Sequence, residues 1–445
     1  MLGPLPPALC RSVFKLVPVD TRLRCREVAR AWRDHVSDRS LWTRLDLSAA
    51  GGVAPERVTV ALLNAAVARA GGDLETLVLE GKIRIDPDAV VAVAAAHART
   101  LRETWLPSTM PGRELRAHVA AVLRAAPALR EVHATSIDPP YCSVADVREM
   151  LCTEPPWGVV RFHALAIVDI NVSAADWRAL WNALAAHISL CEMCVFLIDE
   201  AVTPLSVVVD AALVLRLPRL RLAMQHPVSN IALQLARLLR GGAIEVLSIV
   251  CLDSLLLPGG VDAANELAAA LCDSTSLNKL ILMNLDWSAP ELGVPLLRAL
   301  IGHPLLRSLC VTSTLNGNRP TDSAVCVAFG ALVVANAPAL KKLEISNAAL
   351  DDFGLHHLVV ALPHNTHLRE LNFRGNAMSA YFGRHVLLPA LRANTSLRSV
   401  IVVKPGEEAT VDELTSALVK EIDELLETRR CGDELAAAGA TTQAA

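Results

Sequence analysis

Cysteine and histidine are the residues of this sequence whose spacing comes nearest to supporting chemistry. Cys191 and Cys194 form a Cys-x-x-Cys pair, the spacing of zinc ligands or of a redox-active dithiol. No second pair completes a zinc site, and the pair falls within an apolar segment typical of a strand, so we expect neither metal binding nor redox activity. Four histidines gather on a predicted helix and its exit, without the glutamate of a zinc-protease helix: His356, His357, His364 and His367.

The other common catalytic signatures are missing from the sequence. It contains no Gly-x-Ser-x-Gly nucleophile motif, no phosphate-binding Gly-x-x-x-x-Gly-Lys-Ser/Thr loop, and no Gly-x-Gly-x-x-Gly after a strand. We therefore expect a protein that is not an enzyme and that uses no metal and no cofactor.

Composition limits the class of protein further. The 445 residues are 53% hydrophobic, 20% charged and 4% aromatic, which argues against disorder over most of the length. The formal net charge of −4 provides no basic field to attract nucleic acid. The apolar runs, such as 324–335, are shorter than the roughly 20 residues that span a bilayer, so we expect no membrane partner. The start of the chain lacks the basic region of a secretory signal, and the eleven cysteines follow no regular spacing, which favours reduced thiols in the cytoplasm or nucleus.

A repeated phrase occupies the middle of the chain. Large aliphatic residues stand at positions 0, +3 and +5 of the segment Leu74–Leu79, and this phrase recurs about every 29 residues. Full copies start at Leu190, Leu217, Ile244, Leu277, Leu306, Leu340, Leu368 and Leu397. Degraded copies start at Leu101, Leu129 and Val159.

Helical patterns fill the intervals between the phrases. The segments 229–240, 262–272 and 381–392 carry apolar residues at helical spacing, and several such segments are followed by Gly, Pro or Asn. One short strand and one helix per period form a unit that cannot bury its apolar face alone, so neighbouring units must stack into a continuous core.

This pattern resembles that of leucine-rich repeat proteins with long, ribonuclease-inhibitor-like repeats, over about residues 45–403. The resemblance implies an α/β solenoid, a horseshoe of about 12–13 strand-helix repeats. The asparagine that the family places three residues after the last aliphatic position is found only as Asn376. We therefore expect uneven turns and helices of variable length.

Before the repeats, the first 44 residues have a different pattern. Pro6 and Pro7 are suited to open a helix, and Asp20 is a candidate N-cap for a second one. The predicted helices carry apolar stripes, and a short third helix is expected before Leu41-Trp42. A unit of this size cannot bury all its faces, so it must lean on a neighbour or a partner.

These residues resemble an F-box: Leu5-Pro6, Val13-Phe14, Leu16 with Pro18 and Asp20, Val28 with Trp32, and Leu41-Trp42. The resemblance implies a three-helix domain over residues 1–44 that docks on the adaptor protein of a cullin-based (SCF-type) ubiquitin ligase, while the repeats hold a protein substrate. The residues implied in adaptor binding or its support are Leu5, Pro6, Leu9, Val13, Phe14, Leu16, Leu23, Val28 and Trp32. Pro7-Ala8 departs from the family, whose members usually carry an acidic residue there.

Three alternatives to this reading stay open. The N-terminal helices could merely cap the end of the repeats. The protein could be a repeat scaffold or inhibitor without attachment to a ligase. A GTPase-activating repeat protein shares the long period, but should lack N-terminal helices of this kind.

The alternation of side chains in a strand predicts where a substrate would bind. The residue at +4 of each phrase points away from the core, towards the concave face. These positions read Val78, Trp105, His133, His163, Cys194, Arg221, Ser248, Ile281, Cys310, Glu344, Asn372 and Ile401. This mixed surface predicts protein binding, with Trp105, His133, Arg221, Glu344 and Asn372 as candidate substrate contacts and Trp105 and Arg221 as the best anchors by residue type.

A C-terminal helix is predicted within residues 404–430. Val411, Leu414, Leu418, Ile422 and Leu425 form its apolar stripe, and we expect this helix to cap the last repeat. The remaining tail, residues 431–445, is small and polar and is expected to be disordered.

Overall fold

The computed structural model describes residues 13–15, 17–28, 37–108, 112–136, 160–168, 174–184, 190–197, 205–224, 230–255, 260–285, 287–313, 321–402 and 417–431. The chain divides into two compact units, unit 1 (Met1–Val195) and unit 2 (Phe196–Ala445). Both are built from alternating strands and helices, as the periodic sequence predicts.

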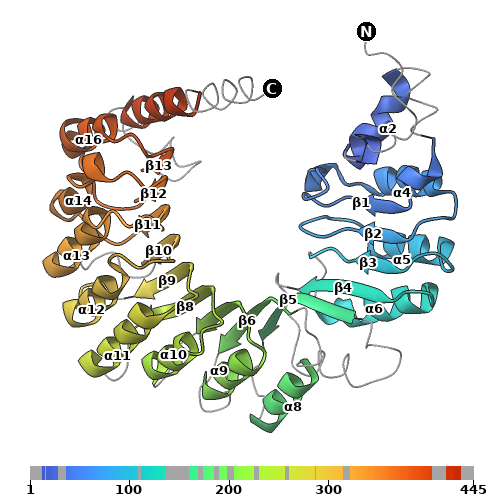
Figure 1. Cartoon of the computed structure of the whole chain (residues 1–445), viewed down its shortest axis with the longest axis horizontal. Helices are drawn as coiled ribbons and strands as arrows, with labels where there is room; N and C mark the ends of the chain where they lie inside the picture. The colour runs from blue at the N-terminus through green and yellow to red at the C-terminus, as the bar shows by residue number, and fades with distance from the viewer. Residues whose placement is uncertain are drawn as a thin grey trace. The chain divides into compact units, whose positions relative to one another are not determined.

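Unit 1 begins with helix α2 (Val19–Val28) and the short 3₁₀ turn η1 (Arg39–Leu41). Its strands β1 to β5 are parallel and lie in sequence order, with helices on one side of them (Figure 1). The strands are β1 (Arg44–Asp46), β2 (Thr76–Val78), β3 (Glu103–Trp105), β4 (Glu131–Ser136) and β5 (Val160–Val168). Between and after them come η2 (Pro55–Arg57), α4 (Val60–Ala70), α5 (Pro87–Ala96), α6 (Gly112–Ala125) and α8 (Ala174–Leu184). Strand β6 (Glu192–Leu197) contains the boundary between the units.

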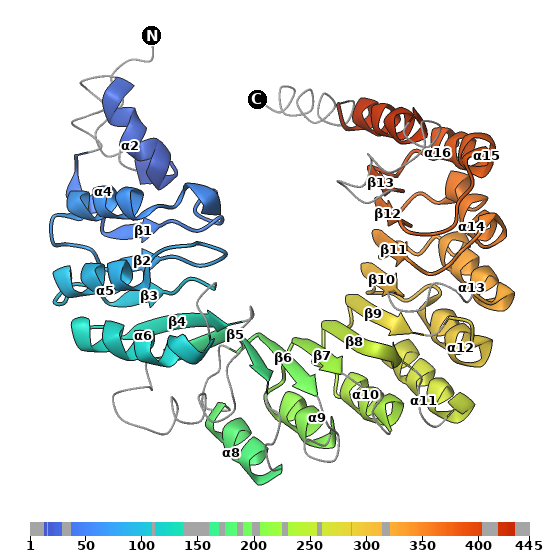
Figure 2. The same cartoon turned by 180° about the vertical axis from the view of Figure 1, so that it is seen from behind.

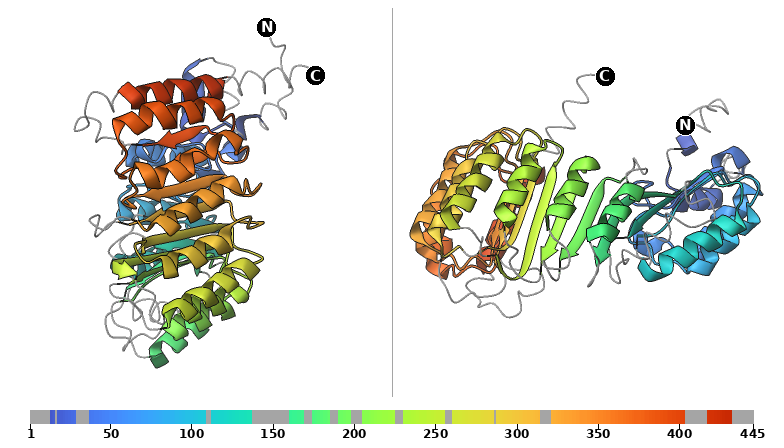
Figure 3. Two further views of the ribbon diagram at one scale, coloured as in Figure 1. Left: turned by 90° about the vertical axis from the view of Figure 1, so that its left-hand side faces the viewer. Right: turned by 90° about the horizontal axis from the view of Figure 1, so that it is seen from below.

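Unit 2 repeats the same alternation of parallel strands and helices. Its helices form one layer and its parallel strands another, as the reverse view and the view from below show (Figures 2 and 3). The strands are β7 (Arg219–Met224), β8 (Val246–Leu255), β9 (Lys279–Leu285), β10 (Ser308–Thr312), β11 (Lys342–Ser346), β12 (Glu370–Asn372) and β13 (Ser399–Ile401). The helices are α9 (Leu205–Val214), α10 (Ile231–Arg240), α11 (Gly260–Asp273), α12 (Pro290–Leu300), α13 (Ser323–Val334), α14 (Asp352–Val359), α15 (Ala380–Phe382) and α16 (Leu388–Ala393), with η4 (Leu362–His364) and the π turn η5 (Gly383–Leu387).

The repeated phrase sets the register of the sheet. In β7 to β13 the +4 residues pair in sequence order, from Arg221 beside Ser248 to Asn372 beside Ile401. The aliphatic residues at 0, +3 and +5 are buried from β7 to β12, as at Leu306, Leu309 and Val311, whereas Val402 at +5 of the last phrase is half-buried. The predicted register is therefore confirmed across these strands.

One phrase was misplaced by the sequence pattern. The expected copy at Val159 made His163 the register partner of His133, but His133 pairs with Arg161, two residues earlier. The β4–β5 register then shifts between Ala134 and Thr135. A shift of two residues leaves the same side chains on each face of the strand, so the alternation of apolar residues in 159–168 could not fix the register.

Several repeats carry a capping side chain three residues before their phrase, and this side chain connects the helix to the strand that follows it. The Asn394 Oδ1 atom accepts hydrogen bonds from the backbone N–H groups of Ser396 (3.0 Å) and Leu397 (2.8 Å). Its Nδ2 atom donates to the carbonyl oxygen of Leu362 in the preceding repeat (2.6 Å). Asn365 makes the equivalent bonds, to Leu368 N (2.8 Å) and to the Val333 carbonyl oxygen (2.9 Å). These buried amides thus satisfy backbone groups of two neighbouring repeats.

Asn376, the asparagine that the family pattern predicts, links two neighbouring repeats in a second way. Its Oδ1 atom accepts from the N–H groups of Ala348 (3.0 Å) and Leu350 (3.2 Å), and its Nδ2 atom donates to the carbonyl oxygens of Ile345 and Phe373 (both 2.8 Å). The turn after β12 is therefore tied to the turn of the preceding repeat.

His303 occupies the same capping position before β10. Because histidine can titrate, we expect the free energy of unfolding of unit 2 to depend on pH. The His303 Nδ1 atom accepts from the N–H groups of Leu305 (3.3 Å) and Leu306 (3.1 Å), which requires the unprotonated nitrogen. Burial lowers the pKa of His303, while hydrogen bonds with the backbone at Leu271 and Ser274 act in the opposite direction. Because the unfolded chain then binds more protons, the stability that neutral His303 provides is lost as the pH falls below about 6.5.

We expect His303→Asn to reduce the loss of unfolding free energy between about pH 7 and pH 5, because asparagine keeps an acceptor but does not titrate. Urea unfolding at each pH measures this slope. The exposed His364→Asn variant is the matched control and should leave the slope unchanged. An unchanged slope in His303→Asn would contradict the assignment.

A helix over 417–431 covers the end of unit 2. Leu418, Ile422 and Leu426 are buried, so Leu426 rather than the predicted Leu425 completes the buried stripe. Leu418 packs so closely on Gly383 that a Cβ atom there would overlap the Leu418 Cδ2 atom. Arg429 donates to the carbonyl oxygens of Leu391 and Leu397. Residues 403–416 and 432–445, where the rest of the predicted helix and the tail lie, are outside the described residues.

Candidate protein-binding surfaces

Hydrogen bonds from a buried arginine hold the N-terminal helix α2 against the first repeat. The Arg22 Nε atom donates to the carbonyl oxygen of Val17 (2.8 Å), and its Nη1 atom donates to that of Leu41 (2.5 Å). The guanidinium carbon lies 5.4 Å from the centre of the fully buried Trp42 ring. Burial lowers the pKa of Arg22, with Asp46 acting in the opposite direction, but an arginine stays protonated. The Leu41-Trp42 segment, which ends the F-box-like pattern, therefore connects helix α2 to the repeats.

Asp20 lies in the first turn of α2 and is not its N-cap, in contrast to the prediction. The helix begins at Val19, two residues earlier than expected, and the N–H of Arg22 donates to the carbonyl oxygen of Pro18 (2.8 Å). The Asp20 carboxylate instead pairs with Arg57 of η2 (3.5 Å) and accepts from Thr21 N (2.7 Å). This ion pair is a second connection between α2 and the repeats.

Three of the predicted adaptor contacts have described side chains. Val13 is 48% exposed, Leu23 is half-buried and Phe14 is buried. Val28 ends helix α2, but its side chain is outside the described part of the structure, as are Leu5, Pro6, Leu9, Leu16 and Trp32. Val13 thus offers an accessible apolar side chain beside a buried aromatic one.

The sheet face of unit 1 brings together two of the predicted substrate contacts. Trp105 on β3 and His133 on β4 are register partners, and their rings are stacked with centroids 4.0 Å apart and planes 14° apart. The Trp105 side chain is half-buried, and His133 is 8% exposed. The pair forms a rigid aromatic platform on an otherwise mixed surface.

Two glutamates that sequence reasoning missed complete this surface. The Trp105 Nε1 atom donates to Glu103 Oε1 (2.7 Å). The His133 Nε2 atom lies 3.3 Å from Glu131 Oε2 and 3.6 Å from Glu103 Oε1. Arg44 on β1 also contacts Glu103 (3.8 Å). Glu103 and Glu131 stand at +2 of their phrases, and since side chains alternate, +2 and +4 share a face; this signal could have identified them.

The remaining predicted contacts lie on the sheet face of unit 2. Glu344 on β11 and Asn372 on β12 are register partners. Asn372 is only 9% exposed, and its Oδ1 atom accepts from Arg374 N (3.2 Å). Arg221 is exposed on β7, four strands from Glu344, which is about 19 Å at ordinary strand spacing. Arg221 therefore cannot share one small site with the other two.

The half-buried thiol of Cys310, beside Glu344, has low reactivity at neutral pH. Burial, together with the carboxylate of Glu344, raises the pKa of Cys310 to about 12. Because the thiolate is the reactive form, Cys310 is a poor nucleophile at neutral pH.

We expect iodoacetamide at about pH 8 to alkylate Cys310 at least a hundredfold more slowly than the exposed Cys272, because the raised pKa of Cys310 leaves very little of its thiol as thiolate. Peptide mass spectrometry of timed samples measures both rates. The Glu344→Gln variant should speed the labelling of Cys310, and equal rates for the two cysteines would contradict the assignment.

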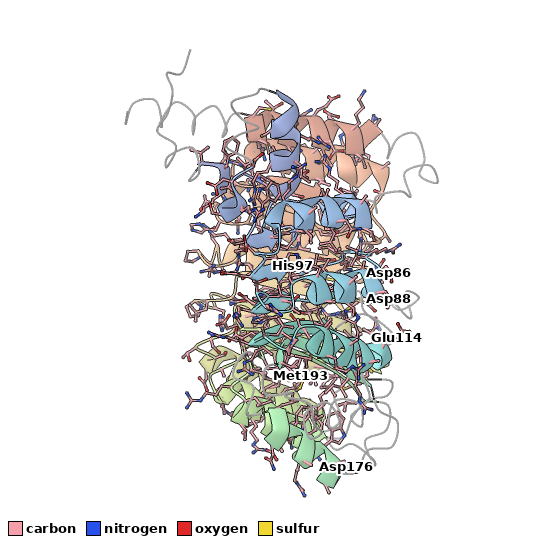
Figure 4. All side chains as sticks on the ribbon, turned by 90° about the vertical axis from the view of Figure 1, so that its right-hand side faces the viewer. Asp86, Asp88, His97, Glu114, Asp176 and Met193 are labelled. Atoms are coloured by element: carbon pink, nitrogen blue, oxygen red, sulfur yellow. The ribbon has the colours of Figure 1, made fainter. Side chains whose placement is uncertain are left out.

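The described residues contain no group of three His, Cys, Asp or Glu side chains placed to hold a metal ion. Cys191 is exposed and Cys194 is buried in β6. Three acidic residues lie at the starts of α5 and α6 (Figure 4): Asp86, Asp88 and Glu114. Their negative charges stabilise these helices by interacting with the positive end of each helix dipole.

Among the residues that the structure describes, no helix is long and apolar enough to cross a membrane.

Comparison with known proteins supports the reading of the N-terminal region. Residues 2–48 match the family described as F-box-like. A search among curated proteins finds no match. Among solved structures, a chain of the Drosophila Toll–Spatzle complex, described as a hub in development and innate immunity, aligns at 11% identity and a TM-score of 0.33. That alignment covers 78% of this chain and 50% of the Toll-complex chain, so this chain spans half the length of that one.

Proposed function

We propose that this protein is the substrate-recognition subunit of an SCF-type, cullin-based ubiquitin ligase. The observation that carries the proposal is the match of residues 2–48 to the F-box-like family. In this proposal the N-terminal helices bind the cullin adaptor protein, and the repeats, which we assign to the leucine-rich class, bind a protein substrate. The chain itself is not an enzyme; catalysis belongs to the other ligase subunits.

The geometry of the N-terminal region supports a docking role. Helix α2 is held by Arg22 and by the Asp20–Arg57 pair, while Val13 keeps an accessible side chain. An N-terminal domain that is fixed to the repeats and keeps an accessible apolar side chain can bind an adaptor while the repeats hold a substrate at a defined position relative to that adaptor. The cytoplasm and nucleus, where cullin ligases act, are the compartments that this proposal requires.

The experiment that tests the proposal is reconstitution with purified adaptor. Full-length protein is mixed with the cullin adaptor protein and analysed by size-exclusion chromatography with light scattering. A stable complex with one copy of each chain is expected. Failure of the two proteins to associate at micromolar concentration would reject the ligase role and favour the scaffold or inhibitor reading.

A further inference from the structure

We propose that the sheet face of unit 1 binds an arginine side chain of the protein substrate, through Trp105, Glu103 and Glu131. This inference deepens the proposed function, because it names the chemical feature that the substrate presents. It depends on that function only for the identity of the bound protein as a substrate.

The first argument is the preorganisation of the aromatic platform. Trp105 is fixed from two directions, by stacking on His133 at 4.0 Å and by the 2.7 Å hydrogen bond from its Nε1 atom to Glu103. An indole that is held in place loses little entropy when a ligand packs against it. Tryptophan also attracts cations through the negative potential of its ring faces.

The second argument is the charge beside the platform. Glu131 is 50% exposed and Glu103 is 29% exposed, so both carboxylates reach the same surface as Trp105. Arg44 lies 3.8 Å from the Glu103 carboxylate, and the Glu131 carboxylate lies 3.3 Å from the His133 Nε2 atom. Two carboxylates next to an aromatic pair repel phosphates and carboxylates and favour a cation.

The geometry favours arginine over lysine. A planar guanidinium can stack on an aromatic ring while it donates paired hydrogen bonds to a carboxylate such as Glu131, which a compact ammonium group cannot do. Arg161, which is the register partner of His133, adds a positive charge on β5, next to β4. This charge limits the cationic site to the β3–β4 part of the face, so we expect a single arginine and not a basic cluster.

The test uses full-length protein labelled with 5-fluorotryptophan and observed by ¹⁹F NMR. The signal of Trp105 is identified by its loss in Trp105→Phe. The probes are the peptides acetyl-Gly-Ser-Arg-Ser-Gly-amide and its citrulline counterpart, which keeps the shape but lacks the charge. The arginine peptide should shift the Trp105 signal with a dissociation constant of order millimolar, as befits one contact of a larger interface.

Glu131→Gln should weaken this binding about tenfold, because a charge-assisted hydrogen bond is lost. Glu370→Gln is the matched control: Glu370 also stands at +2 of its phrase and is 52% exposed, but it lies in unit 2 and should leave the titration unchanged. Equal responses to both peptides, an unmoved Trp105 signal, or equal affinities of the two variants would overturn the inference.

Adaptor binding separates this inference from the proposed function. Glu131→Gln should still form the complex with the cullin adaptor. Arginine-selective binding without adaptor capture would reject only the ligase role, whereas adaptor capture without arginine selectivity would reject only the arginine site.

Discussion

Replacing Val13 by aspartate should reduce the affinity for the cullin adaptor at least about a hundredfold. Val13 is 48% exposed beside the buried Phe14, in the aliphatic-Phe pair of the F-box-like region. An aspartate there would carry an unpaired charge into an apolar interface, which costs about 3 kcal/mol or more. Isothermal titration calorimetry with purified adaptor measures the change.

The control for this experiment is Val214→Asp. Val214 is 71% exposed at the end of α9 in unit 2, so the same substitution introduces the same charge away from the F-box-like region. Both variants should unfold at the temperature of the unmodified protein, because neither side chain is buried. Adaptor binding by Val13→Asp equal to that of Val214→Asp would show that this segment does not contact the adaptor.

Truncating Trp42 to alanine should lower the free energy of unfolding by about 3–5 kcal/mol, the usual cost of removing a large buried aromatic side chain. Trp42 is completely buried and lies under the guanidinium of Arg22. Its loss leaves a cavity at the connection between α2 and β1, so protease cleavage within α2 should also become faster. Urea unfolding monitored by circular dichroism measures the stability change.

The matched control is Tyr381→Ala, because Tyr381 is 73% exposed and should cost less than about 0.5 kcal/mol. A similar loss in both variants would mean that Trp42 has no special role. Unchanged α2 proteolysis in Trp42→Ala, despite reduced stability, would show that Trp42 stabilises the repeat but does not hold the helix.

The repeats were predictable because their positions obey simple periodicity. Leu309 and Val311 are buried and Cys310 is accessible because a parallel strand alternates its side chains, and the sequence states this alternation repeatedly. At residues 159–168 the predicted register was wrong by two residues, because a shift by one full period of the alternation leaves the same side chains on each face.

The connections between elements were less predictable. Asn394 and His303 perform the same capping role with different side chains, so no single residue type marks the position. The link from Arg22 to Leu41 spans nineteen positions, and sequence alone does not say which backbone carbonyl an arginine will reach. The Trp105–Glu103 hydrogen bond depends on two side-chain rotamers, which alternation does not specify.

Hydrogen–deuterium exchange of the full-length protein, with and without saturating cullin adaptor, tests the central claim most directly. We predict slower exchange in the segment that includes residues 13–28, while the strands of unit 2 exchange as they do in the free protein. Exchange that does not change at the N-terminal segment, or protection confined to the repeats, would contradict the assignment of this protein as a ligase subunit.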